Sequence, residues 1–515
     1  MRILTIVDKV GSAIWRMAED VRKELDFLDI KVLSLHPKRP SLEEIQAIEE
    51  FEPDLLDIQY WKSGEKLFEL LPKYKEIPAV LSHHNPYDLM AKDWSHYKKN
   101  IVSNLTQKRV LRDVEVVTLS VDVNKFKWNP DYTEEKSVVM CAARIEGKKG
   151  ILPVAKVCSE LGYKFYLVGR ISDQNYYSEI LKYKPIMAVD ASDEELIEIY
   201  NKSAIHVCNS VDNFETGTLP MLECMSVGVP IITRPIGYIP DVNQEGILVH
   251  DSEPENEEAL KVLIKNLMED RELRLSMRDK AWNIIKEKNV YRRAWKLYKI
   301  WNSALYKEDL VSVIINTFNR ADNLQQILEA YLDNNWKNIE IVVVDDGSDK
   351  PDLNEQVVKN FRQTGVTIRY FNTRCKGYGL AKARNIGIIN SAGEYLLFND
   401  DRWLPKKDLI QEFINKIEDN SYLCANKNNN KKSFVENVSF IKRSTMIKAG
   451  MFCERINKYG GMTQEIVTRM NRNGIKCLWN EKAQVTQLSG SKSRFRKKDE
   501  ILDMKNLLWR MYDKI

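Results

Sequence analysis

One stretch in the first half of the chain bears most directly on the fold. It reads Ser210-Val-Asp-Asn-Phe-Glu215-Thr-Gly217-Thr-Leu-Pro220-Met-Leu-Glu223-Cys-Met-Ser-Val-Gly228-Val-Pro230. Two glutamates alone at this spacing are usually surface residues, but these two flank a glycine-containing turn that opens an apolar helix. A turn at a helix N-terminus offers free backbone N–H groups to phosphate, and nearby carboxylates accept hydrogen bonds from sugar or ribose hydroxyls. The stretch therefore predicts a binding site of that chemistry.

Short β-rich runs alternate with helical patterns on both sides of this stretch. The alternation is typical of parallel βαβ units, and a break near Asn129 divides it into two series. Two series predict two doubly wound lobes that face a cleft. From Glu257 to about Lys307, apolar spacing predicts one long amphipathic helix. The expected strands are Ile3–Val7, Ile30–Leu35, Leu55–Gln59, Ala79–Ser82, Val114–Leu119, Ser137–Ala142, Lys164–Val168, Ile186–Val189, Ile205–Asn209 and Pro230–Thr233.

The pattern restarts at Asp309. Val311–Asn316 predicts a buried strand, Asn323–Leu332 a helix, and Ile339–Val344 a second strand that runs into Asp345-Asp346-Gly347-Ser348. An Asp-rich turn at the carboxyl end of a strand lies where open α/β sheets bind ligands. We therefore expect three parts: a first lobe over residues 1–133, a second lobe over residues 134–305, and a separate domain over residues 309–515.

Length and composition agree with several globular domains. A chain of 515 residues is too long for one core and predicts two to four domains. Hydrophobic residues at 43% and charged residues at 30% exclude a disordered or fibrous chain. Residues 1–308 carry 44 Lys and Arg against 49 Asp and Glu, whereas residues 309–515 carry 34 against 25. The basic second half suits an anionic ligand or surface, with a solvated basic face as the alternative.

Cysteine and apolar patterns bear on the compartment. Eight scattered cysteines without a Cys-x-x-Cys pair predict free thiols in a reducing compartment. No stretch approaches the ~18 apolar residues of a membrane span, so no transmembrane segment is expected. We expect a cytoplasmic protein, with a peripheral membrane location, or the host cytoplasm for a viral protein, as alternatives. The tail from Ser491, basic and then apolar, predicts an amphipathic helix docked on its own domain.

Residues 1–305 resemble the retaining nucleotide-sugar glycosyltransferases of family 4, which have the two-lobed GT-B fold. The family signature of Glu, seven residues, Glu and a Gly-x-Pro helix end is matched from Glu215 to Pro230. The family's N-terminal glycine-rich loop is reduced here to Gly11-Ser12. Weaker matches, in the family's order, are Phe51-Glu-Pro-Asp, His83-His84, Val121-Asp122 with Phe126, and Arg144 with Lys149-Gly150.

The family-4 resemblance implies roles for five residues. Glu215 and His84 would be catalytic, with a purely structural His84 as an equal alternative. Arg144, Lys149, Glu215 and Glu223 would bind the donor. Arg144 and Lys149 suit a diphosphate clamp, because the leaving nucleoside diphosphate accumulates negative charge. Such a clamp uses cations and backbone groups, so no cofactor is expected in this module.

Residues 309–490 resemble the family-2 glycosyltransferases of the GT-A fold. The resemblance is carried by Val311–Arg320, Val342–Ser348, Gly379–Gly387 and Glu394–Pro405. It implies that Thr317 and Asp345 contact the base and ribose and that Arg384 contacts the nucleotide. Asp400 and Asp401 stand in the family's DxD-type position, with Asp400 binding the donor and Asp401 holding Mn²⁺ or Mg²⁺. Asn399 replaces an acidic residue often found before them.

The family-2 catalytic segment, Gly-Gly-Glu-Asp-x-Glu, is altered here. It aligns with Gly460-Gly461-Met462-Thr463-Gln464-Glu465, so the usual base position holds Thr463, which cannot deprotonate a hydroxyl near neutral pH. Glu465 is therefore the expected base. The alternative is that Glu465 pairs with Arg469, four residues on along the same helix face. Gln487 stands where many relatives carry a metal-binding histidine.

These resemblances predict an α/β bifunctional glycosyltransferase, with a GT-B module of two Rossmann-like lobes followed by a GT-A module. It would transfer sugars from nucleotide-sugar donors to a glycan or lipid-linked acceptor. One alternative is a single active transferase plus a catalytically weak sugar-nucleotide-binding module, suggested by Thr463 and Gln487. Another is a viral enzyme that glycosylates modified DNA bases. DNA is the less favoured acceptor because the basic residues lack an interleaved aromatic platform.

Overall fold

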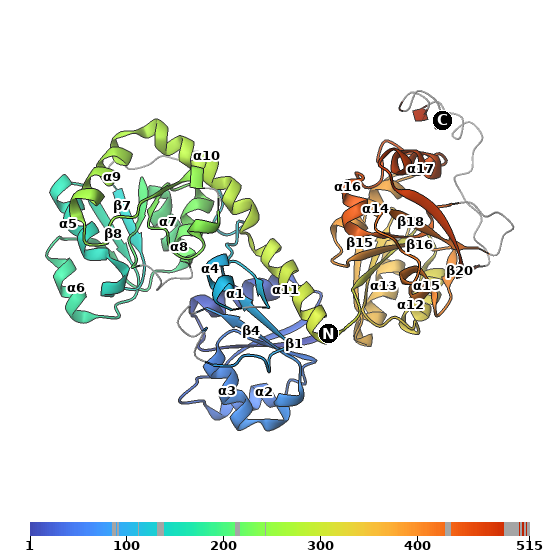
Figure 1. Ribbon diagram of the computed structural model, residues 1–515, viewed down its shortest axis with the longest axis horizontal. Coiled ribbons are helices and arrows are strands. Elements are labelled where there is room, and N and C mark those ends of the chain that lie inside the picture. Colours follow the sequence, from blue (N-terminus) through green and yellow to red (C-terminus); the bar gives the residue numbers. More distant parts are fainter. Residues whose placement is uncertain are drawn as a thin grey trace. The chain divides into compact units, whose positions relative to one another are not determined.

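The structure is a computed structural model that describes residues 1–84, 89, 92–111, 113–130, 138–211, 217–242, 244–427, 434–488, 504, 507, 508 and 511. The chain folds into two compact units, Arg2–Ile300 and Trp301–Ile515, whose elements are labelled in Figure 1. Both units are layered α/β structures. Within the described residues, no helix is long and apolar enough to cross a membrane.

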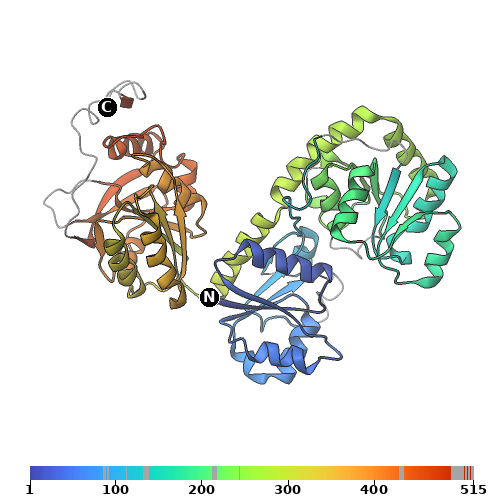
Figure 2. The same cartoon turned by 180° about the vertical axis from the view of Figure 1, so that it is seen from behind.

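The first lobe of the N-terminal unit is a six-stranded parallel sheet in the order β2-β1-β3-β4-β5-β6. Its central strands are buried on both faces because helices cover both sides; α1 lies on one side and α2 and α3 on the other (Figure 2). The sequence did not predict β5, in which only two of four residues are apolar. The elements are β1 (Arg2–Val7), α1 (Ala13–Glu24), β2 (Asp29–Ser34), α2 (Leu42–Glu49), β3 (Leu55–Ile58), α3 (Trp61–Leu70), β4 (Ala79–His83), β5 (Lys99–Val102), α4 (Leu105–Val110) and β6 (Val114–Val116).

The second lobe is another six-stranded parallel sheet, in the order β12-β11-β10-β7-β8-β9. Alternate residues of β7 point to opposite faces, so Val139 and Cys141 join a cluster with α5, α6 and α9, whereas Met140 and Ala142 join one with α7 and α8. The three-residue strand β12 was not predicted. The elements are β7 (Val138–Ala142), α5 (Ile151–Leu161), β8 (Lys164–Val168), α6 (Gln174–Leu181), β9 (Ile186–Ala188), α7 (Asp193–Lys202), β10 (Ile205–Cys208), α8 (Leu219–Val227), β11 (Ile231–Thr233), β12 (Ile247–Val249) and α9 (Glu257–Glu269).

The single long helix predicted from residue 257 to residue 307 is wrong. The segment forms three helices, α9, α10 (Arg271–Glu287) and α11 (Val290–Leu305). Asp270 caps α10 by accepting a hydrogen bond from the Leu273 N–H at 2.9 Å. Asn289 likewise accepts from the Arg292 N–H at 2.9 Å. Asp and Asn are preferred N-cap residues because their side chains satisfy otherwise unpaired N–H groups, and they were the available signal for both breaks.

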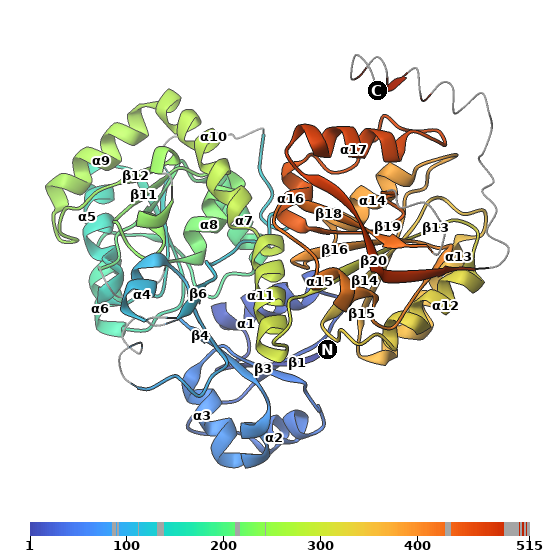
Figure 3. The ribbon, with the colours of Figure 1, turned by 45° about the vertical axis from the view of Figure 1, so that its right-hand side comes forward.

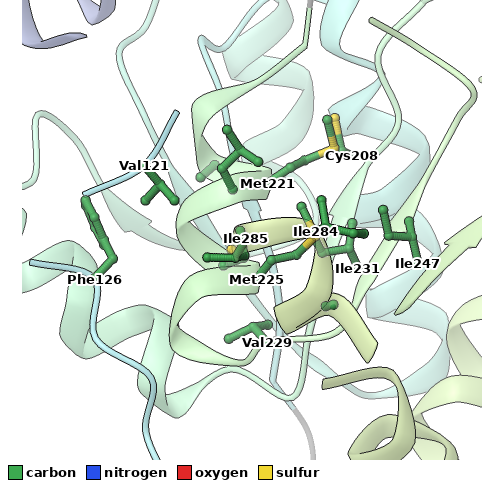
Figure 4. Packing of buried hydrophobic residues seen from close by; sticks show 14 of the residues in the cluster. Val121, Phe126, Cys208, Met221, Met225, Val229, Ile231, Ile247, Ile284 and Ile285 are labelled. Atoms are coloured by element: carbon green, nitrogen blue, oxygen red, sulfur yellow. The ribbon is translucent and has the colours of Figure 1, made fainter. Parts of the chain in front are cut away.

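Helix α8 is buried on all sides. Every residue from Met221 to Val227 is buried, and Figure 4 shows Met221 and Met225 packed with Ile284 and Ile285 of α10. A short helix without a solvent-exposed polar face belongs in a core. This packing fixes the direction of α8 and therefore the position of its N-terminus.

The C-terminal unit contains an eight-stranded mixed sheet in the order β15-β14-β13-β16-β19-β18-β20-β17 (Figure 3). Strands β15, β14, β13 and β16 are parallel, and β19 runs antiparallel to β16. Because β14 and β16 lie on opposite sides of β13, the carboxyl ends of these strands form a topological switch point. The elements are β13 (Val311–Thr317), α12 (Ala321–Leu332), β14 (Ile339–Asp345), α13 (Pro351–Phe361), β15 (Thr367–Asn372), α14 (Leu380–Ile389), β16 (Tyr395–Asp400), β17 (Trp403–Pro405), α15 (Leu409–Ile414), β18 (Ser421–Asn426), β19 (Val438–Lys442), α16 (Arg443–Lys448), α17 (Met462–Arg472) and β20 (Lys476–Gln487).

Two apolar clusters cover the faces of this sheet. One contains side chains of α12, α13 and α15, and the other contains side chains of α14, α16 and α17. Met504 and Leu508, from the tail, are buried in the second cluster. These residues place part of the tail on its own domain, whereas residues 491–500 lie outside the described residues.

Candidate functional site

A cavity of about 640 Å³ lies between the two lobes of the N-terminal unit. Its lining follows the carboxyl ends of parallel strands, where doubly wound sheets bind ligands. Of the residues implicated by the sequence, the cavity brings together four. These are His84, Arg144, Lys149 and Glu223. Glu215 lies outside the described residues.

The N-terminus of α8 opens onto this cavity. Gly217 has φ +126°, and a Cβ there would lie 2.3 Å from a carbon of the Tyr238 ring, so only glycine fits the turn. Gly217, Thr218, Leu219 and Pro220 all line the cavity. The Thr218 hydroxyl is buried and has no hydrogen-bond partner within the described structure. The first N–H groups of a helix have no intrahelical partner, which makes this end suited to an anion.

Glu223 has both a site role and a structural role. It is only 4% exposed, and its Oε2 accepts a hydrogen bond from the Tyr200 hydroxyl at 2.7 Å. Its Oε1 lies 3.8 Å from Nη2 of Arg16, which also lines the cavity. Burial raises the pKa of Glu223, although Arg16 opposes that shift. Glu223 is therefore part of the packed core as well as of the cavity lining.

Two cations, Arg144 and Lys149, precede the Glu215–Pro230 segment by more than 60 residues and line the same cavity. Arg144 is exposed, with Nη2 3.4 Å from Oε1 of Glu146. Lys149 is buried, and burial lowers its pKa. Gly150 follows with φ +57°, where a Cβ would meet the Asn209 carbonyl oxygen at 2.2 Å. That close approach holds the start of α5 against β10 and positions Lys149.

His84 is oriented by a buried polar chain that the sequence did not reveal. Gln59 Nε2 donates to both carboxylate oxygens of Asp57, at 2.9 and 2.8 Å. The Gln59 Oε1 therefore faces His84 Nε2, 3.0 Å away, and accepts its hydrogen. Burial, then Arg293 and His83, lower the pKa of His84 to about 3. The ring is neutral at physiological pH, and its Nδ1 carries the lone pair.

In the C-terminal unit, the predicted residues gather at the switch point of the sheet. Thr317 is paired in register with Asp345, and Asp400 ends the neighbouring strand. Thr317 is buried, and within the described part of the unit its hydroxyl has no hydrogen-bond partner. Asp345 is fully buried: Oδ1 accepts from the Ser348 N–H at 2.7 Å, and Oδ2 accepts from Asn354 at 2.7 Å and from the Tyr370 hydroxyl at 2.9 Å. These bonds give Asp345 a structural role in shaping the turn.

The two aspartates at the end of β16, Asp400 and Asp401, are both held by arginines. Asp401 Oδ1 accepts from Arg320 Nη1 at 2.8 Å, and Oδ2 accepts from the Phe318 N–H at 2.9 Å. Burial raises the pKa of Asp401 to about 6, although Arg320 opposes that shift. Asp400 Oδ1 accepts from Arg384 Nη2 at 3.0 Å, and its Oδ2 lies 3.3 Å from Arg402 Nη2.

Asn399 points away from this pair. Its Oδ1 accepts from the Tyr331 hydroxyl at 2.8 Å, and its Nδ2 donates to the Trp403 carbonyl at 2.9 Å. Asn399 therefore stabilises the start of the loop rather than replacing a ligand.

The structure does not support Glu465 as the base. Glu465 is buried, and Arg469 donates Nε to its Oε1 at 2.7 Å and Nη2 to its Oε2 at 3.1 Å. Arg469 also donates to the Met451 carbonyl at 2.5 Å, so the pair joins α17 to the preceding loop. Both carboxylate oxygens are committed to this structural ion pair. Gln487 ends β20 and is exposed.

A carboxylate missed by the sequence reasoning lies beside Thr463 instead. Glu436, in the segment before β19, is buried and accepts a hydrogen bond from the Thr463 hydroxyl. It also lies 3.3 Å from Arg384 Nη1. Nothing in the local sequence marks Glu436, because it is brought to α17 by tertiary packing. Within the residues that the structure describes, no group of three His, Cys, Asp or Glu side chains could hold a metal ion.

The two units have the folds of glycosyltransferases: two parallel Rossmann-like sheets of the GT-B type, and a mixed sheet consistent with GT-A. Residues 122–283 match the family described as "Glycosyl transferases group 1", and residues 312–467 match "Glycosyl transferase family 2". The chain therefore combines a group 1 glycosyltransferase region with a family 2 glycosyltransferase region. The predicted order of a GT-B module and then a GT-A module is confirmed.

Similar proteins agree with this assignment over parts of the chain. An uncharacterized glycosyltransferase of Rickettsia felis is 34% identical over 152 residues, which is 29% of this chain and 24% of that protein. Glycosyltransferase GlyA of Streptococcus pneumoniae is 34% identical over 111 residues, 21% of this chain and 15% of that protein. These matches span less than a quarter of the relatives' own lengths. The structure of a sucrose-phosphate synthase of Thermosynechococcus elongatus is 14% identical, covers 60% of this chain and 100% of that chain, and has a TM-score of 0.50, a likeness of fold alone.

Proposed function

We propose that the chain is a bifunctional glycosyltransferase that uses nucleotide-sugar donors in two modules, residues 1–305 and residues 309–515. The proposal rests chiefly on one cavity in which a helix N-terminus, two cations and a carboxylate converge: α8, Arg144, Lys149 and Glu223. Nucleoside diphosphates need cations and N–H donors, and sugar or ribose hydroxyls need acceptors. The cavity offers both within about 640 Å³, a volume typical of small-molecule sites.

In the N-terminal module, charge develops on the diphosphate as the glycosidic bond breaks. Lys149, Arg144 and the N–H groups at the start of α8 stabilise that charge in the proposed complex. Glu223 and Glu215 accept hydrogen bonds from the hydroxyls of the donor. His84, which Gln59 holds in place, is assigned to a hydroxyl of the transferred sugar. These groups suffice for binding without a metal ion.

In the C-terminal module, the proposed donor site lies at the carboxyl ends of β13, β14 and β16. Arg384 and Asp400 are assigned to the nucleotide-sugar, and Thr317 and the turn held by Asp345 to the nucleoside. A divalent cation fits Asp401, because a carboxylate has about four lone-pair sites and Asp401 uses two. One carboxylate with the donor diphosphate and water can hold Mg²⁺ or Mn²⁺. Such a cation would supply charge neutralisation at the diphosphate.

The acceptor is proposed to be a glycan or a lipid-linked glycan, and the compartment to be the cytoplasm, where the chain's free cysteines stay reduced. A second candidate function has a specific observation in its favour. Thr463 stands in the usual base position, and Glu465 is committed to Arg469. The C-terminal module would then bind a sugar nucleotide without transferring it.

Donor hydrolysis by the full chain separates these possibilities. UDP-glucose, UDP-galactose, UDP-N-acetylglucosamine and GDP-mannose are each incubated with wild type, Lys149→Ala and Asp401→Asn, and nucleotide release is measured. If both modules are active on different donors, each variant should lose nucleotide release from one donor and keep it from another. If both modules use the same donor, each variant should lose only part of the release. If Lys149→Ala abolishes all release, the C-terminal module is a binding module. If neither variant changes release, the proposed sites are wrong.

A further inference from the structure

The start of α17, where the proposed reaction needs a proton acceptor, holds one carboxylate, Glu465, and it is paired with Arg469. Displacement at a sugar carbon by a hydroxyl requires a group that takes the hydroxyl proton, and a positioned side chain contributes about 10²–10⁴-fold in rate. Thr463 cannot accept that proton, and Glu465 faces Arg469 through both of its oxygens. The proton acceptor must come from another element.

Glu436 supplies a carboxylate at that place from a different part of the chain. It precedes β19, which pairs with β16, the strand that ends in Asp400. The two carboxylates of Glu436 and Asp400 share one guanidinium, because Arg384 places Nη1 3.3 Å from Glu436 Oε1 and Nη2 3.0 Å from Asp400 Oδ1. Glu436 is thereby tied to the strand-end cluster that forms the proposed donor site.

The second oxygen of Glu436 is turned toward a hydroxyl group. Oε2 accepts the hydrogen of Thr463 Oγ1, whereas Oε1 faces Arg384. A hydroxyl that already donates to this oxygen shows that the carboxylate can accept an O–H hydrogen in this direction. The Thr463 side chain is only partly buried, in contrast to Glu436 and Arg384. The hydrogen bond therefore marks the side of the carboxylate that lies toward the less buried start of α17.

The buried charge of Glu436 is balanced by the cations around it. Arg384 lies between Glu436 and Asp400, and Asp400 also has Arg402 Nη2 at 3.3 Å. A buried carboxylate must be paired and hydrogen-bonded, and Glu436 meets both conditions beside Thr463, which stands in the family's base position.

We propose that Glu436 is the general base of the C-terminal module, in place of the carboxylate that Thr463 lacks. The inference rests on the proposed transferase function of that module. The acceptor O–H bond breaks and its proton passes to Glu436 Oε2, while the acceptor oxygen bonds to C1 of the sugar. The bond from C1 to the diphosphate oxygen breaks, and its electron pair leaves with the nucleoside diphosphate. Thr463 and Arg384 hold the two oxygens of the base in position.

The test uses the full chain carrying Lys149→Ala, which silences the N-terminal module, with the four donors named above, Mn²⁺, and water as acceptor. Glu436→Gln keeps the shape and is not basic; its amide oxygen can accept from Arg384, and its amide nitrogen can donate to the Thr463 hydroxyl oxygen. It should lower kcat for donor hydrolysis by about 10²–10⁴-fold and change donor affinity, measured by calorimetry, by less than about threefold. The matched control is Glu454→Gln, an exposed carboxylate that accepts from Asn385 of the same helix as Arg384; it should keep the parent rate.

A double variant that moves the carboxylate to position 463 distinguishes a base from a residue that is only structural. Thr463→Asp added to Glu436→Gln should recover at least tenfold of the lost rate, because it returns a base to the other end of the same hydrogen bond. Unchanged kcat in Glu436→Gln, or no recovery in the double variant, would overturn the proposal. Equal losses of kcat and donor affinity would instead assign Glu436 to holding Arg384. No turnover in the Lys149→Ala parent would refute transfer by this module altogether, which distinguishes the two failures.

Discussion

Replacement of Glu223 tests whether this carboxylate binds the donor or only supports the fold. Three variants separate the two roles: Glu223→Gln, Glu223→Ala and Tyr200→Phe. The glutamine retains an acceptor for the Tyr200 hydroxyl, the alanine removes it, and the phenylalanine removes the hydroxyl while leaving the carboxylate. All three act at the 2.7 Å hydrogen bond between Tyr200 and Glu223, and the two Glu223 variants also remove the negative charge that faces Arg16 at 3.8 Å.

The expected magnitudes follow from burial and charge. Glu223→Ala leaves a buried hydroxyl without a partner and should lower the free energy of unfolding by about 1–3 kcal/mol. Tyr200→Phe loses one hydrogen bond to a charged group, about 1.5–3 kcal/mol. Glu223→Gln should cost less than either, because it keeps the hydrogen bond and removes the charge whose burial raises the pKa of Glu223. Loss of one charged hydrogen bond to the donor weakens affinity by roughly 10–150-fold.

Urea denaturation gives the stability of each variant, and calorimetry with a nucleotide-sugar gives the affinity. We expect both Glu223 variants to lose donor affinity and Tyr200→Phe to keep it within about threefold, even though Tyr200→Phe is less stable than Glu223→Gln. The reasoning is refuted if donor affinity follows stability across the three variants. Glu223 would then act through packing of α8 rather than through contact with the donor.

Three further predictions concern other parts of the two sites. Asp401→Asn should remove Mn²⁺-dependent donor binding by the C-terminal module in calorimetry, and binding that persists in EDTA would contradict it. Burial raises the pKa of Asp346 from 3.8 to about 7, so the folded state binds this proton more tightly than the unfolded chain. Stability should therefore fall as pH rises from about 4 to 7, and Asp346→Asn should flatten that slope in urea denaturation at pH 5 and 8. Gln59→Leu should release His84 and lower kcat of the N-terminal module about tenfold; an unchanged kcat would assign the chain from Asp57 to His84 to stability alone.

Local sequence predicted the elements whose identity depends on near neighbours. The strands around Val311 and Ile339 are rich in Val and Ile, because a parallel sheet covered on both faces buries every residue. The turn before α8 was readable from Gly217 and the apolar run after it. The breaks at Asp270 and Asn289 were also marked locally by N-cap residues, yet the continuous apolar periodicity masked them. Strand β5 was missed because only two of its four residues are apolar, and β12 because three residues are too few for a pattern; both are defined by their partners in the sheet.

The sequence by itself therefore determined the order of the two modules, their sheets and the strand ends at which the polar residues gather. Only the tertiary structure decided what each of those polar side chains faces. Asp345 turns to Asn354 and Tyr370, Glu465 to Arg469, and Glu436 reaches Thr463 from 27 positions away. The physical reason is that a motif fixes where a carboxylate leaves the backbone, whereas its role depends on which distant donors or cations packing brings within hydrogen-bonding distance.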